Sequence, residues 1–126
     1  MDKNYLSAIL EYNRAISENN KFIPAIINIG IIKYEEGDKQ GAIFQWQQAI
    51  EINNQVAESI LALAVALYSQ GKEAEAHSLA EKALKLDKNT ADVKFLRKNL
   101  WGDKLIADTQ RLLSTNRIKR FLSQKT

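Results

Sequence analysis

Apolar residues recur along the chain at helical spacing, and the pattern as a whole returns 34 residues further on. The segment that begins at Pro24 aligns with the segment that begins at Glu58. At this offset tyrosines, glycines and small residues coincide: Gly30 with Ala64, Tyr34 with Tyr68, Gly37 with Gly71, Ala42 with Ala76, Ala49 with Ala83, and Ile50 with Leu84. A period of this length predicts a stacked unit of two antiparallel helices.

Such a unit needs small side chains at fixed places, because two helices joined by a tight turn approach each other closely where they cross. The sequence resembles the tetratricopeptide-repeat (TPR) family in these small residues and in the turns Gly37-Asp38 and Gly71-Lys72. The resemblance implies an all-α fold, a right-handed superhelix of antiparallel helix pairs (an α-solenoid) with about seven helices.

The same frame divides the whole chain. Residues 23–56 and 57–90 are predicted to be TPR repeats, and residues 1–22 the second helix of an incomplete repeat. Ala8 and Ala15 precede Ala42 and Ala49 by 34 residues, which supports a helix over 3–18. Its missing partner indicates either an upstream truncation, which we favour, or a helix supplied by another chain.

The C-terminal part continues the frame less cleanly. Gly102 precedes Ala107 as Gly37 precedes Ala42, so residues 91–114 are expected to form a degenerate capping repeat, with Thr90 capping its first helix. The alternative is one continuous helix through Gly102, which a glycine weakens by only ~1 kcal/mol. The string FLRKNLWGDKLIADTQRLL also resembles the ends of some cyanobacterial TPR proteins.

Composition supports a helical chain and narrows its chemistry. The 126 residues include one proline, five glycines and no cysteine, which excludes disulfides and thiolate metal sites. We expect no metal and no cofactor, since the single histidine, His77, has no metal-ligand cluster and no phosphate-binding glycine loop occurs. Trp46 and Trp101 fall at core spacings, and Glu35 is expected to be solvated. The chain is therefore predicted not to be an enzyme.

In TPR proteins the first helix of each repeat lines the concave side, so the resemblance implies a partner-binding groove here. Its predicted members are Ile27, Asn28, Ile31, Tyr34, Glu58, Leu61, Val65, Tyr68 and Phe95. The alternative is that these side chains belong to the core. An exposed apolar stripe would suit an amphipathic helix. Acidic chaperone tails are disfavoured, because the clamp positions hold Ile27, Ile31 and Ala62 rather than cations.

Charge is distributed unevenly: residues 1–90 carry a net charge of −3 and residues 91–126 one of +6. Residues 115–126 form a basic tail that could fold as a short amphipathic helix, and its cations are Arg117, Lys119, Arg120 and Lys125. Such a segment can contact anionic membranes or nucleic acid. A solvated terminus is the more common outcome, so both contacts are disfavoured.

The function predicted from these patterns is that of a protein-interaction module, such as an assembly or scaffolding factor, whose partner is a protein or peptide. The alternative is a structural unit that forms a homo-oligomer through its incomplete N-terminal repeat. With no long apolar run and no signal-peptide layout, we expect a cytoplasmic location, or else a soluble domain of a membrane-anchored protein.

Overall fold

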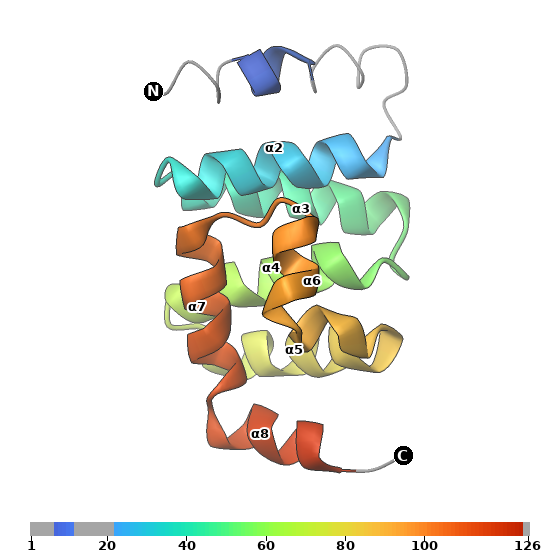
Figure 1. Ribbon diagram of the computed structural model, residues 1–126, viewed down its shortest axis with the longest axis vertical. Coiled ribbons are helices and arrows are strands. Elements are labelled where there is room, and N and C mark those ends of the chain that lie inside the picture. The colour runs from blue at the N-terminus through green and yellow to red at the C-terminus, as the bar shows by residue number, and fades with distance from the viewer. Residues whose placement is uncertain (1–6, 12–21, 125–126) are drawn as a thin grey trace.

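The computed structural model describes residues 7–11 and 22–124, and all regular structure in these ranges is helical (Figure 1). The first five residues of this set, 7–11, are helical; the rest of the helix expected over 3–18 lies outside the described residues. The other elements are α2 (Ile23–Glu35), α3 (Lys39–Ile52), α4 (Ala57–Ser69), α5 (Glu73–Leu86), the 3-10 turn η1 (Lys88–Ala91), α6 (Val93–Lys98), α7 (Asp103–Leu113) and α8 (Asn116–Ser123).

Two helical hairpins, α2 with α3 and α4 with α5, form the expected repeats, and α3 packs against α4 to join them. Each hairpin turns at a glycine with a left-handed backbone, with φ of 91° at Gly37 and 84° at Gly71. The amide of Asp38 donates to the carbonyl of Lys33, and Lys72 repeats this bond with Leu67. These bonds satisfy the carbonyls at the helix ends, so the two turns are equivalent. The predicted all-α repeat architecture is thereby confirmed.

The small residues predicted at the helix crossings are fully buried. Ala42, Ala49, Ala76 and Ala83 have no exposed surface. In the first repeat Gly30 lies against the indole of Trp46, whose Nε1 donates to the carbonyl of Ile27 at 3.1 Å. In the second repeat the corresponding places hold Ala64 and Ala80. The two crossings therefore fill their space differently, one with glycine and tryptophan and the other with two alanines.

The C-terminal third departs from the expected capping repeat. The helix is interrupted between Lys98, where α6 ends, and Asp103, where α7 begins. The alternative of one continuous helix through Gly102 is therefore wrong. Thr90 is buried in η1 and donates to the carbonyl of Asp87, whereas Asp92 caps α6 by accepting from the amide of Lys94. The expected cap at Thr90 is therefore also wrong.

The path of α7 is the largest difference from a regular solenoid. A further repeat would add its helices to the free end of α4 and α5. Instead, α7 crosses α4 and α2 on the side away from α3 and α5 (Figure 1). The last helix, α8, then packs against α5 and α7. The C-terminal segment, which was expected to extend the stack, instead turns back over α2 and α4, the first helix of each repeat.

Gly30→Ala should destabilise the fold by roughly 1–3 kcal/mol, because the new Cβ would lie 2.4 Å from Trp46 Nε1. In a Trp46→Leu background, where the indole is gone, the same change should instead stabilise by about 1 kcal/mol through helix propensity. Urea unfolding of the four chains measures this coupling. Equal costs in both backgrounds would show that the indole does not require the glycine.

Candidate functional site: the concave face of α2 and α4

The apolar residues predicted to line an open groove are instead part of the core. Ile27, Ile31, Tyr34, Leu61 and Val65 are all at most 4% exposed. The expectation that this stripe faces solvent is therefore wrong, and the alternative that these side chains are buried is correct. The physical reason is the C-terminal segment: α7 packs across α2 and α4, and Leu96 of α6 and Trp101 belong to the same buried apolar cluster as these side chains. Asn28, Glu58, Tyr68 and Phe95 are half-buried.

The helix that covers the concave face is strongly amphipathic. Its buried residues recur at helical spacing: Leu105, Ile106, Thr109 and Leu112. The three apolar ones belong to the same core cluster as the face that they cover. Thr109 satisfies its hydroxyl by donating to the carbonyl of Leu105 at 2.7 Å. The opposite side of α7 carries exposed residues, among them Lys104 and Arg111. The concave face is thus covered by an amphipathic helix of the same chain.

Glu35, the last residue of α2, binds the N-terminus of α7. Its two carboxylate oxygens accept from the backbone amides of Lys104 at 3.0 Å and Leu105 at 2.9 Å. These amides have no partner within their own helix, and a negative charge is favourable at the positive end of the helix dipole. The expectation that Glu35 is solvated is wrong, because the contact joins residues about 70 positions apart and no local pattern indicates it.

Tyr34 forms the second polar contact, donating its hydroxyl to the carboxylate of Asp108 on α7. Asp108 also accepts from Arg111 one turn further on, and the ammonium of Lys39 lies 5.6 Å from the centre of the Tyr34 ring. Burial raises the pKa of the Tyr34 phenol well above its ordinary value, and the bond to Asp108 raises it further. The phenol therefore remains a hydrogen-bond donor at any physiological pH.

Glu58 forms the third polar contact, accepting from the indole Nε1 of Trp101 at 2.8 Å. Trp101 precedes α7 by two residues and is only 3% exposed, so its predicted core position is confirmed. Burial raises the pKa of the Glu58 carboxyl, and the hydrogen bond from Trp101 lowers it in part. The three contacts hold the lead-in of α7 (Trp101 and Gly102, the two residues before the helix), its first turn and its second turn.

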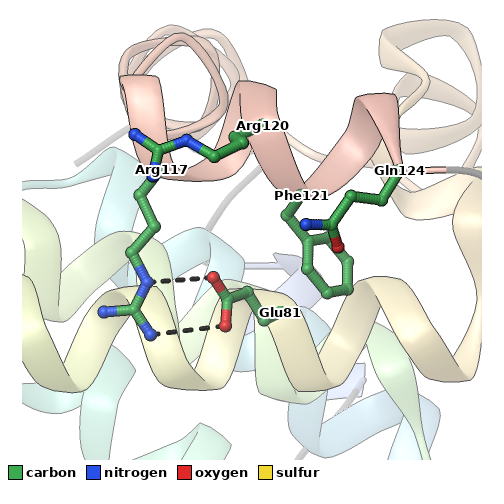
Figure 2. A pocket seen from close by; sticks show the side chains of 5 residues that line it. All are labelled: Glu81, Arg117, Arg120, Phe121 and Gln124. Carbon is green, nitrogen blue, oxygen red and sulfur yellow. Dashed lines mark hydrogen bonds and ion pairs between the residues drawn. The ribbon is translucent and has the colours of Figure 1, made fainter.

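Within the basic tail, α8 is a folded helix that packs on α5 of the second repeat. Thr115 caps α8, and Ile118 is completely buried. Figure 2 shows Arg117 and Phe121 pointing from α8 toward α5, where the Arg117 guanidinium binds both carboxylate oxygens of Glu81 at 2.9 and 3.3 Å. The apolar residues Ile118 and Phe121 of α8 belong to or pack against the core, whereas Leu122 is exposed. Lys119 and Arg120 are exposed, and Lys125 lies outside the described residues.

Side chains with other chemistry are few. His77 is half-buried with its ring centre 5.9 Å from that of Tyr68, and its Nε2 is buried without a hydrogen-bond partner. Among the described residues, no group of His, Asp and Glu is placed to hold a metal ion. No helix in residues 7–11 or 22–124 is long and apolar enough to cross a membrane.

Two stacked helical hairpins with glycine turns and close-packed crossings define a helical-repeat protein of the α-solenoid class. Residues 56–86 match the family model of the tetratricopeptide repeat. This range begins one residue before α4 and ends with the last residue of α5. Residues 56–86 are therefore similar to a tetratricopeptide repeat, and the resemblance inferred from the 34-residue period is confirmed for this segment. A search of curated proteins found no match. TPR repeats are protein-interaction modules, and this class of function is what the repeat supports.

Ile31→Glu should cost several kcal/mol of stability, because an unpaired carboxylate would be buried under α7. The matched control is Phe44→Glu, which places the same charge at a position that is 56% exposed on α3 and should melt with the parent. Thermal melting followed by circular dichroism compares the two. If Ile31→Glu also melts with the parent, α7 does not cover this face in solution.

Glu58 should make the stability of the fold depend on pH. Since burial raises its folded-state pKa, the folded chain binds more protons than the unfolded chain, and stability should fall as pH rises from about 4.5 to that raised value. Glu58→Gln keeps an acceptor for Trp101 but cannot ionise, so its stability relative to the parent should increase over this window. Urea unfolding between pH 4 and pH 8 tests this, with the exposed-site variant Glu75→Gln expected to follow the parent.

Proposed function

We propose that the chain is a protein-interaction module whose concave face binds one amphipathic helix, and that α7 is the internal occupant of this site. The observation that carries the proposal is the position of α7 across α2 and α4, with its apolar side on the concave face and polar contacts to its first and second turns. Recognition of an amphipathic helix by an apolar groove through residues spaced by three or four is a general mode of peptide binding.

An internal ligand changes how a partner must bind. A tethered segment acts at an effective concentration in the millimolar range, so an external helix has to displace it. The apparent affinity of that helix is lowered by the small fraction of chains whose groove is open. A partner therefore binds well only when it makes more contacts than α7 or when α7 is released first. An assembly or scaffolding role would use this competition to bind a partner only in the correct complex.

The decisive experiment is complementation with a peptide. In the full chain, Leu105→Asp and Leu112→Asp together remove two of the three buried apolar side chains of α7 and place charges under it, since both positions are completely buried. A peptide of residues 99–114 with the natural sequence should bind this variant, raise its melting temperature and bind the parent chain at least ~10-fold more weakly. The control is the same peptide carrying Leu105→Asp and Leu112→Asp, which should do neither.

Fluorescence anisotropy of the labelled peptide and thermal melting provide independent measurements, so binding is detected even where the variant chain is only partly folded. If the natural peptide neither binds nor restores stability, α7 is a permanent part of the core, and the concave face is not a binding site.

The alternative of self-association through the incomplete N-terminal repeat stays a prediction, because most of the helix concerned lies outside the described residues. The contacts of the described residues favour the concave face.

A further inference from the structure

Three polar contacts join the repeats to residues 101–108, and they fall at fixed positions along this stretch of chain. Trp101 lies two residues before α7, Gly102 and the amides of Lys104 and Leu105 lie at its start, and Asp108 is the sixth residue of the helix. An apolar groove by itself would accept many amphipathic helices in several registers. Polar groups at fixed places restrict which helix fits and where it begins.

The lead-in requires a hydrogen-bond donor on a large apolar side chain. Glu58 is half-buried and its carboxylate accepts from the Trp101 indole, which is itself nearly completely buried. Phenylalanine at this place would fill similar space without an N–H, and the Glu58 carboxylate would lose this bond. A buried acceptor that loses its donor costs more than the bond itself contributes, so the groove discriminates in favour of tryptophan.

The start of the helix requires glycine. A Cβ on Gly102 would lie 2.3 Å from Cδ of Glu35. The Glu35 side chain cannot move aside freely, because both of its oxygens are bound to the amides of Lys104 and Leu105. Any larger residue would have to break those bonds to enter. The same carboxylate therefore binds a helix start and rejects a side chain immediately before it.

The second turn requires a carboxylate. Tyr34 is 1% exposed and donates its hydroxyl to Asp108, while the Lys39 ammonium lies near its ring. The groove thus has a donor and a cation at this depth, and two acceptors, Glu35 and Glu58, at the entry. A helix with an acid in its second turn and none at its lead-in matches this distribution of charge.

From this arrangement we propose that the partner of the concave face is a protein segment with a tryptophan–glycine lead-in followed by an amphipathic helix with an acidic sixth residue. Its third, fourth and tenth helical positions are apolar, as Leu105, Ile106 and Leu112 are here. This inference rests on the proposed function and names the partner class of the same site. A second copy of the chain carries this segment too, and it is one of the occupants that the test distinguishes.

The test uses the full chain with Leu105→Asp and Leu112→Asp, and peptides of residues 99–114. Relative to the natural peptide, Trp101→Phe, Gly102→Ala and Asp108→Asn should each raise the dissociation constant about tenfold. The matched control is Gln110→Ala, an exposed position on the same helix, which should stay within about twofold. Fluorescence anisotropy gives the constants, and the molar mass from light scattering shows whether the chain also binds its own kind.

A change in the groove should weaken one of these preferences. A Tyr34→Phe chain lacks the donor for the acidic residue, so its preference for the natural over the Asp108→Asn peptide should fall well below tenfold, to what the Lys39 ammonium still contributes. The Trp101→Phe peptide should remain about tenfold weaker on this chain, because Glu58 is unchanged.

The two levels of the proposal fail in different ways. If the natural peptide binds but the three variants bind within twofold of it, the groove takes any amphipathic helix, and the inferred partner class is wrong while the proposed function stands. If no peptide binds, the proposed function itself is wrong.

A second measurement applies where the variant chain is unfolded. In the otherwise natural chain, urea unfolding of Tyr34→Phe, Asp108→Asn and the double variant should show non-additive costs, as should Glu58→Gln with Trp101→Phe. Additive costs for both pairs would mean that these contacts do not select the bound segment.

Discussion

The apolar side chains that α2 and α4 turn away from α3 and α5 have to be covered, and the rest of the C-terminal structure depends on how this is done. In a stack of two repeats, the first helix of each repeat packs one side against the second helices. Its other side is also apolar and is left without a partner inside the stack. Here Ile31 and Val65 on that side are nearly fully buried because α7 crosses both helices. Burying apolar area of this kind contributes about 25 cal/mol per Å², which dominates the stability of a short stack.

The short α6 and the break before α7 follow from this crossing. To turn back over α4 and α2, the chain has to leave the direction of the stack within a few residues. It does so through η1, a six-residue α6, and Leu100, which has a left-handed backbone with φ of 70°. Non-glycine residues adopt this conformation only at a cost, so the packing of Trp101 and α7 beyond it must outweigh the local strain.

Acidic residues in the repeats bind hydrogen-bond donors in the basic C-terminal part of the chain. The acidic first part supplies Glu35, Glu58 and Glu81, and the basic C-terminal part presents helix amides, an indole and Arg117 to them. Part of the charge asymmetry visible in the sequence is thus used in contacts within the molecule. The exposed Arg117–Glu81 pair contributes little stability by itself, whereas the partly buried contacts of Glu35 and Glu58 define the register of α7.

The 34-residue period by itself determined the two hairpins, their glycine turns at Gly37 and Gly71, and the buried alanines at the crossings. These features depend on local spacing, and local spacing is what a sequence displays directly. The sequence also predicted an apolar stripe along α2 and α4, but as a solvent-facing groove for a partner helix, whereas the structure buries that stripe under a helix of the chain. Tertiary structure alone decided that the helix is α7, because a stripe at Ile31 and Val65 has the same pattern whether water, a partner or the chain itself covers it. The contacts of Glu35 and Glu58 likewise join residues 43 to 70 positions apart, and nothing in the neighbourhood of either glutamate encodes such a partner.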